Sequence, residues 1–205
     1  MSAKRYIKSW HCRRNHEKIS DNWCLRSYCG LCPRYYTEGT SKCNGCGSPT
    51  SYPGCPIHRC CVKVNGLETC AECKDFPCSK FKGALEEYDS FLTHKKMLPN
   101  LNYIKNYGVE EHLHQLKERM ELLEEMLREF NEGRSKSFYC MAATLLSVEN
   151  IRKSIESAKK KVDTLGINRE DLKNRAKILK EIINDFALKE HVNLKLRKPS
   201  TRAKS

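Results

Sequence analysis

Residues 109–130 read VEEHLHQLKERMELLEEMLREF, and apolar side chains recur along this stretch at alternating steps of four and three. An α-helix turns once in about 3.6 residues, so this spacing places the recurring side chains on one stripe of an amphipathic helix. We expect His112 and His114, near the charged start of the helix, to be exposed. The residues of the stripe are Val109, Leu113, Leu116, Met120, Leu123, Leu127 and Phe130.

The same periodicity returns twice further along the chain, at 151–165 and 172–186. Gly133 and Gly166 follow the first two periodic stretches and are typical helix stop signals, while Asn168 is placed to cap the third. A shorter segment, SFYCMAATLL at 137–146, fits a helix buried on most of its surface. Each periodic stretch is short and the first two end at a glycine, so the pattern predicts an antiparallel helical bundle rather than a long coiled coil.

The composition changes near Gly83, because twelve of the thirteen cysteines precede it and only Cys140 follows. A gap of two residues lets both sulfurs of a tight turn reach one tetrahedral ion, so repeated Cys-x-x-Cys pairs predict metal binding. Nine thiols suit two four-coordinate centres, and the sequence leaves their pairing open. The candidate ligands are Cys29, Cys32, Cys43, Cys46, Cys55, Cys60, Cys70, Cys73 and Cys78.

The first twenty residues contain no apolar run followed by a small-residue cleavage site, as a secretory signal would. No stretch approaches the roughly 20 apolar residues that span a bilayer. We therefore expect a cytoplasmic protein with no membrane association. Cysteines in a reducing compartment more often hold metal than form disulfides, and an odd total of thirteen leaves at least one thiol unpaired.

These observations predict four regions: a basic extension at 1–28, a cysteine-rich metal-binding module at 29–83, the helical bundle at 84–194, and a basic disordered tail at 195–205. The expected fold class is a small irregular, loop-rich α+β module bound to metal, followed by the all-α bundle. The module has few large apolar residues, so it needs metal support. Cys140 fits the role of a small apolar core residue, and Cys61 can be read in the same way.

Zinc is the expected metal, with two ions per chain, because separated Cys-x-x-Cys turns are typical of structural zinc sites. An iron–sulfur cluster is the alternative, since Cys32-Pro33 and Cys55-Pro56 are compatible with one. A ferredoxin run of three cysteines at two-residue gaps does not occur. Residues His11, Cys12, His16 and Cys24 form a weaker candidate for a further metal site, and His58 could replace a cysteine ligand.

Five motifs, YCGLCPRYY, CNGC, CPIHRC, CAECKDFPCSKF and NEGRSKSFYCMAATLL, resemble the uncharacterised prokaryotic cysteine-rich domain-of-unknown-function family 3795. The first four span 28–81, and the last falls in the helical part. The resemblance implies the framework of nine cysteines named above, and it implies no activity. Cys61 stands where the resemblance would place a small apolar residue, and Cys12 and Cys24 precede the shared region.

The net charge of +13 is carried by the two ends of the chain. Residues 1–83 have a formal charge of +8, residues 84–194 are neutral, and the tail from Lys195 adds five basic residues. Eight thiolates bound to two divalent ions would cancel about half of the positive charge of residues 1–83. Arginines and tyrosines near the thiols keep nucleic acid open as a partner, although no recognition signature accompanies them.

The turn NEGRSKS offers a second candidate site, for an anion held by Arg134, Ser135, Lys136 and Ser137 at the start of a helix. An ordinary interhelical turn has the same composition. No histidine stands in a catalytic motif, so the sequence gives no evidence of an enzyme. The favoured function is a structural-zinc protein that binds a macromolecular partner, most simply a protein. The alternatives are an iron–sulfur redox or accessory protein and a nucleic-acid binder.

Overall fold

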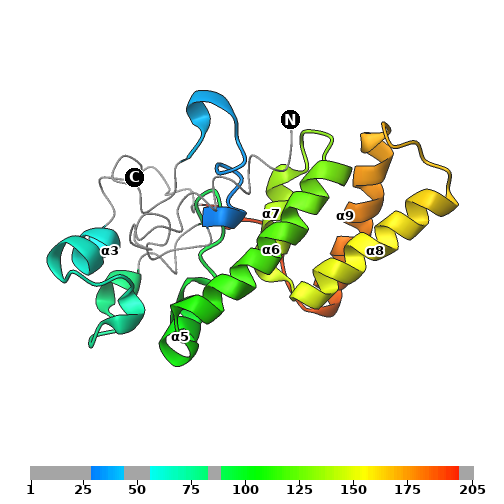
Figure 1. Ribbon diagram of the computed structural model, residues 1–205. Helices are drawn as coiled ribbons and strands as arrows, with labels where there is room; N and C mark the ends of the chain where they lie inside the picture. The colour runs from blue at the N-terminus through cyan, green and yellow to red at the C-terminus, as the bar shows by residue number, and fades with distance from the viewer. Residues whose placement is uncertain (1–28, 44–55, 83–88, 199–205) are drawn as a thin grey trace, which may run out of the picture.

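The computed structural model describes residues 29–43, 56–82 and 89–198, and every structural statement below concerns these residues. Four helices pack together at one side of the molecule (Figure 1). They are α6 (Val109–Phe130), α7 (Lys136–Leu145), α8 (Val148–Thr164) and α9 (Leu172–Lys189). The short helix α3 (Pro56–His58) lies at the opposite side, and α5 (Met97–Tyr107) connects the two parts.

The main core lies between α6 and the three helices that follow it. Leu123, Met126 and Phe130 of α6 are fully buried there, as is Tyr139 of α7, whose hydroxyl donates to the backbone oxygen of Phe130 at 3.0 Å. Helices α8 and α9 contribute apolar side chains at the spacing expected from the sequence. These are Ile151, Ile155, Ala158 and Val162 from α8 and Ala176, Leu179 and Ile183 from α9.

The turns between these helices begin and end at identifiable residues. Gly133 and Gly166 follow α6 and α8 with positive φ angles of 98° and 61°, a conformation that favours glycine. The third periodic helix begins later than expected, because Asp171 rather than Asn168 caps α9. The Asp171 carboxylate accepts from the backbone N–H of Asn174 at 3.1 Å, whereas Asn168 accepts from Glu170 before the helix starts.

The expected fold class is wrong in its first half. The cysteine-rich residues within 29–43 and 56–82 contain no β-strand, so the α+β description of the module does not hold. The cysteine-rich part instead forms short helical turns, in which backbone N–H groups donate to carbonyls a few residues earlier in the chain. These turns are η1 (Cys29–Leu31), η2 (Gly39–Ser41), η3 (Arg59–Val64), η4 (Cys70–Glu72) and η5 (Ser79–Phe81). The helical content of the rest fits a bundle.

Helix α5 is an element that the periodicity count missed. Its buried residues Met97, Leu101 and Ile104 pack with Ile57 and Phe81 of the cysteine-rich part in a second apolar cluster. A count of the steps of four and three between these residues, before the stop at Gly108, would have found it. The second cluster therefore joins the cysteine-rich residues to the helices.

His112 is buried, contrary to expectation, with only 3% of its surface exposed. It lies on the face of α6 that meets α5, where its ring stands 6.1 Å from that of Tyr103. Burial lowers the pKa of His112 from 6.5 to about 4, and the positive charge of Arg119 contributes in the same direction. The imidazole of His112 is therefore neutral in the folded protein at pH 7.

This burial predicts a stability that falls as the medium is acidified. Between about pH 6.5 and pH 4 the unfolded chain binds a proton at His112 that the folded chain does not, so unfolding becomes easier as pH falls. The full effect is roughly 3 kcal/mol. Urea titrations at a series of pH values should show this slope, and His112→Phe should remove it. His114→Phe, at an exposed position, should keep it; equal slopes for His112→Phe and wild type would contradict the prediction.

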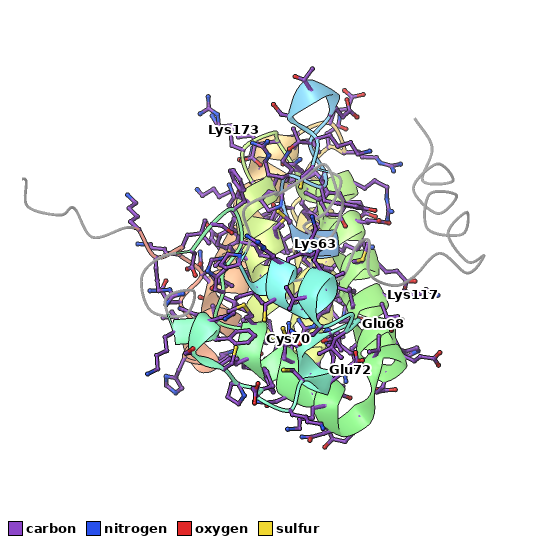
Figure 2. The ribbon with its side chains drawn as sticks, turned by 90° about the vertical axis from the view of Figure 1, so that its left-hand side faces the viewer. Lys63, Glu68, Cys70, Glu72, Lys117 and Lys173 are labelled. Atoms are coloured by element: carbon purple, nitrogen blue, oxygen red, sulfur yellow. The ribbon has the colours of Figure 1, made fainter. Side chains whose placement is uncertain are left out.

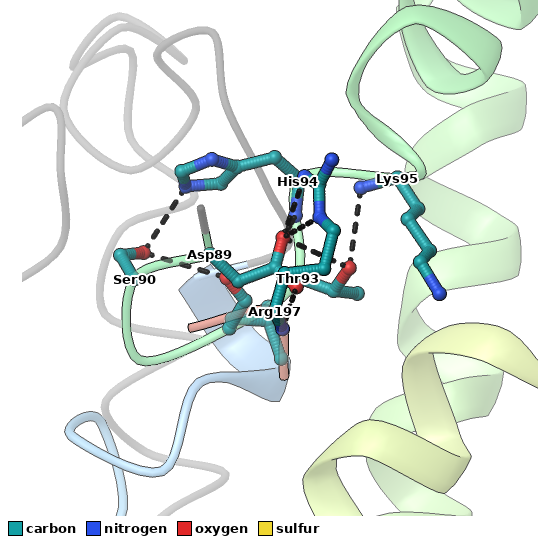
Figure 3. A network of polar contacts seen from close by, with 7 residues as sticks. Asp89, Ser90, Thr93, His94, Lys95 and Arg197 are labelled. Carbon is teal, nitrogen blue, oxygen red and sulfur yellow. Dashed lines mark hydrogen bonds and ion pairs between the residues drawn. The ribbon is translucent and has the colours of Figure 1, made fainter. Parts of the chain in front are cut away.

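The segment after α9 returns to the start of the helical part and is fixed there by one carboxylate (Figure 3). Asp89 Oδ1 accepts from Arg197 Nη2 at 2.8 Å and from the backbone N–H of His94 at 3.0 Å, while its Oδ2 accepts from the Arg197 backbone at 2.8 Å. Burial alone would raise the pKa of Asp89, but these hydrogen bonds hold it at about 2. The carboxylate is therefore ionised at any pH near neutrality.

Loss of the Arg197 side chain should weaken this connection. We expect Arg197→Ala to lower the free energy of unfolding by about 2 kcal/mol, because the fully buried Asp89 carboxylate loses its charged donors. Lys198→Ala removes the same charge from an exposed neighbour and should change the free energy of unfolding by less than about 0.5 kcal/mol. Denaturation in urea measures both. The prediction fails if the two variants have the same midpoint.

Among the described residues, no helix has both the length and the apolar composition required to cross a membrane.

Candidate metal centre

Five cysteines from three short segments line one small pocket. Cys60 and Cys61 come from η3, Cys70 from η4, and Cys73 and Cys78 from the loop between η4 and η5. We call this the cysteine pocket; its other lining residues are Ile57, Asn65, Leu67, Phe76, Lys80 and Phe81. Figure 2 shows the face of the molecule on which it lies, with Lys63 on η3 and Cys70 on η4 labelled. Four of these cysteines were expected as ligands.

The turn that holds Cys70 and Cys73 is fixed by a capping box. The Thr69 hydroxyl accepts from the Ala71 backbone N–H at 3.3 Å, and the Glu72 carboxylate accepts from the Thr69 backbone N–H at 2.9 Å. The backbone N–H of Cys73 then donates to the Cys70 carbonyl at 3.1 Å. This pattern, which the sequence TCAEC encodes locally, brings both ends of the Cys-x-x-Cys motif into one tight turn.

The segment with Cys60 and Cys61 ends in a second tight turn. The backbone N–H of Asn65 donates to the Cys60 carbonyl at 3.1 Å, and that of Leu67 donates to the Cys61 carbonyl at 3.0 Å. Gly66 permits this reversal because its φ angle is +64°. The Asn65 side-chain amide stands 3.5 Å from the Cys60 sulfur and is oriented to donate to it. An amide donor of this kind stabilises a thiolate.

The inner side of the pocket is apolar and rests on α5. Phe76 and Phe81 stack edge to face with their ring centroids 5.7 Å apart, and Ile57 is 1% exposed. These side chains pack against Met97 and Leu101 of α5. Water is therefore excluded from one side of the sulfurs, which strengthens any electrostatic interaction that they make.

The sulfurs of the pocket interact with one another. The pKa of Cys70 is raised, first by its hydrogen bond to the Cys61 side chain and then by burial and by the negative charges of Cys61, Cys78 and Cys73 as thiolates. The pKa of Cys61 is lowered, because the Cys70 thiol donates to its sulfur. Repulsion between thiolates opposes the loss of further protons, and a bound cation would reverse this effect.

The chemistry of these donors fits a thiophilic metal ion, although their positions do not form a finished ligand set. Within 29–43, 56–82 and 89–198, no group of three or more histidine, cysteine or acidic residues converges on a single point. Seven of the described cysteines are free thiols: Cys43, Cys60, Cys61, Cys70, Cys73, Cys78 and Cys140. The thiols thus line a common pocket without forming a complete set of metal ligands.

The other expected ligands lie elsewhere. Cys29 begins η1, and Cys32 follows that turn and packs against the main core. Cys43 is half-buried, and its backbone N–H donates to the Arg34 carbonyl at 3.0 Å. Cys46 and Cys55 lie outside the residues that the structure describes, as does the candidate site at His11, Cys12, His16 and Cys24. The second metal centre expected from the sequence therefore lies only partly within the described residues.

Cys61 is the pocket residue whose role the sequence left in doubt. It is buried, as a small apolar residue would be, yet its sulfur contacts that of Cys70. In its neutral form it also donates to the Leu67 carbonyl at 3.6 Å. The signal for its position is Gly66, four residues before Cys70, which makes the turn that returns the chain to the Cys60–Cys61 pair.

The candidate anion site at the start of α7 contains a carboxylate in the structure. The buried Ser135 hydroxyl donates to Glu132 rather than capping the helix. Lys136 Nζ donates to the Thr37 hydroxyl at 3.1 Å, and Arg134 is exposed. Hydrogen bonds from Ser135 and Lys180 outweigh the effect of burial and lower the pKa of Glu132. The resulting negative charge opposes anion binding at this turn.

Comparison with known proteins gave no match: no family model, no curated protein and no solved structure is significantly similar to the chain.

Proposed function

We propose that this chain is a metal-binding protein in which thiolates hold structural zinc and keep a surface in shape for a macromolecular partner. The observation that supports the proposal is the cysteine pocket, where five thiols from separate turns line one cavity. Cys70, Cys73 and Cys78 supply three ligands, and Cys60 or Cys61 supplies the fourth. Each thiol releases its proton to water as its sulfur binds the ion.

Zinc fits this donor set better than harder cations do, because thiolates are soft ligands and the pocket offers no cluster of carboxylates. A centre with four thiolates has no open coordination position for a substrate. The ion would therefore stabilise the turns rather than perform chemistry. It would stabilise the fold of a region whose own apolar cluster is small.

A partner would meet the side chains that these turns present. Lys63 and Val64 on η3 are exposed, Val64 to 71%, and Glu68 is exposed on the loop before η4. Figure 2 shows Lys63 and Glu68 on the same face. An apolar side chain flanked by charges of both signs is suited to contact with a protein surface. Zinc would fix the relative positions of the two turns that carry these residues.

Metal analysis of the purified full-length chain, together with its visible spectrum, tests the proposal. We expect about two zinc ions per chain and no visible absorption. Cys73→Ser should remove one ion, whereas Ser79→Ala, at an exposed position on η5, should retain both. Iron with acid-labile sulfide and broad visible absorption would replace zinc with an iron–sulfur cluster. A chain without metal after anaerobic purification and zinc addition would overturn the proposal.

A further inference from the structure

The cysteine pocket holds more thiols than one tetrahedral ion can bind. A structural zinc ion takes four ligands, whereas five cysteines line the pocket. The Asn65 side-chain amide is oriented to donate to the Cys60 sulfur at 3.5 Å, as donors to ligand thiolates do. Under the proposed function Cys60 then supplies the fourth ligand, and Cys61 is the thiol that the ion leaves unused.

Cys61 lies on the buried side of the pocket, in contact with a thiol from the other turn. Only 3% of Cys61 and 7% of Cys70 is exposed, and the Cys70 thiol donates a hydrogen bond to the Cys61 sulfur. A disulfide has an S–S distance of about 2 Å, so two sulfurs already in contact need only a small movement to form one. This pair is therefore well placed for oxidation.

The backbone holds the two cysteines opposite each other. The Leu67 N–H donates to the Cys61 carbonyl at 3.0 Å, and Gly66 makes the reversal that this hydrogen bond requires. The capping box that begins at Thr69 then fixes Cys70 at the start of η4. Both turns are held by hydrogen bonds of the chain itself, so the contact between the sulfurs does not depend on a metal ion.

A small oxidant can reach the pair through the pocket. Cys60, Cys73 and Cys78 line the same cavity and are half-buried rather than fully buried. The cavity thus extends from partly exposed thiols to the contact between Cys61 and Cys70. Hydrogen peroxide is small enough to follow this path, whereas a protein oxidant would meet the half-buried thiols first.

We infer that Cys61 and Cys70 form a disulfide when hydrogen peroxide enters the cysteine pocket, which makes the pocket a redox-sensitive switch. One sulfur attacks a peroxide oxygen, the O–O bond breaks, and a sulfenic acid and a water molecule form. The second sulfur displaces the hydroxyl group as another water molecule. Two electrons pass from the sulfurs to the peroxide, and the two thiol protons leave in the water.

The disulfide does not require the proposed function, but its consequence for zinc rests on it. In the zinc-loaded chain the solvent supplies the proton that Cys70 lost to the metal. Once Cys70 is part of a disulfide it is no longer a thiolate, so the ion loses one of its four ligands. Oxidation should therefore release zinc from the pocket, and a thiol reductant should allow it to bind again.

Mass spectrometry of the full-length chain tests the inference. The reduced protein is treated with an equimolar amount of hydrogen peroxide, alkylated with iodoacetamide, and digested with trypsin without reduction. Trypsin separates the two cysteines, because it cleaves after Arg59, Lys63 and Lys74 and so gives the peptides 60–63 and 64–74. We expect these two peptides to be linked, with the loss of two hydrogen atoms.

Fragmentation of the linked peptides identifies the two sulfurs. It should assign the bond to Cys61 and Cys70. A bond between Cys70 and Cys73, a bond from Cys60, or full alkylation of both cysteines after oxidation would overturn the inference. A wild-type chain that forms the expected bond but takes up no zinc would overturn the proposed function and leave the disulfide in place.

Two variants provide a matched comparison. Cys61→Ser should lose the link between the peptides and keep the wild-type zinc content when reduced, because Cys60 remains as a ligand. Cys43→Ser, at a half-buried position outside the pocket, should keep the link. Peroxide should remove one more zinc ion per chain from the wild type than from Cys61→Ser. Loss of zinc from reduced Cys61→Ser would make Cys61 a ligand and overturn the switch.

Discussion

Removal of zinc with a chelator is expected to unfold residues 56–82 while α8 and α9 stay folded. The cysteine-rich segments have short turns and a small apolar cluster, so under the proposed function the metal would supply most of the free energy that keeps them folded. Structural zinc contributes on the order of 10 kcal/mol to the folding of small domains of this kind. Helices α8 and α9 pack in the main core and have no such dependence.

Hydrogen exchange followed by mass spectrometry measures this difference segment by segment. Peptides from 56–82 should lose their protection on chelation and regain it when zinc is added back, and peptides from 148–164 should exchange as slowly as before. Unchanged protection in 56–82 after complete loss of zinc would show that the metal does not stabilise these turns.

The helices could be predicted from the sequence because apolar periodicity records which face of each one is buried. The stripe of α6 ends at Phe130, as the structure has it, and Gly133 and Gly166 follow their helices with positive φ. His112 was misjudged, since its neighbours along the chain are charged and only the position of α5 explains its burial. Contacts between segments that are distant in the chain leave no pattern among neighbouring residues of the sequence.

The candidate site could be predicted only in part. The spacing of Cys70 and Cys73 marks a tight turn, but the sequence left open which cysteines combine; the structure places this turn and Cys78 along the same pocket. The spacing does not say that Cys61 faces Cys70, because this depends on the reversal at Gly66.

Truncation of Phe130 is expected to be the most damaging single change in the bundle. Its ring is fully buried at the end of α6, and the Arg175 guanidinium stands 5.1 Å from the ring centroid. Phe130→Ala would leave a cavity that the surrounding helices cannot fill and would expose the half-buried network around Arg175 to water. We expect a loss of about 3–5 kcal/mol in the free energy of unfolding.

Denaturation in guanidinium chloride, followed by circular dichroism of the zinc-loaded chain, measures this loss. Phe91→Ala is the matched control, because it makes the same substitution where 58% of the side chain is exposed and should cost less than about 1 kcal/mol. Phe130→Leu should fall between the two, since it keeps most of the apolar volume but loses the ring beneath Arg175. Equal losses in the free energy of unfolding for Phe130→Ala and Phe91→Ala would show that the main core is not centred on α6. The bundle would then have no such core to keep it folded once the metal is removed.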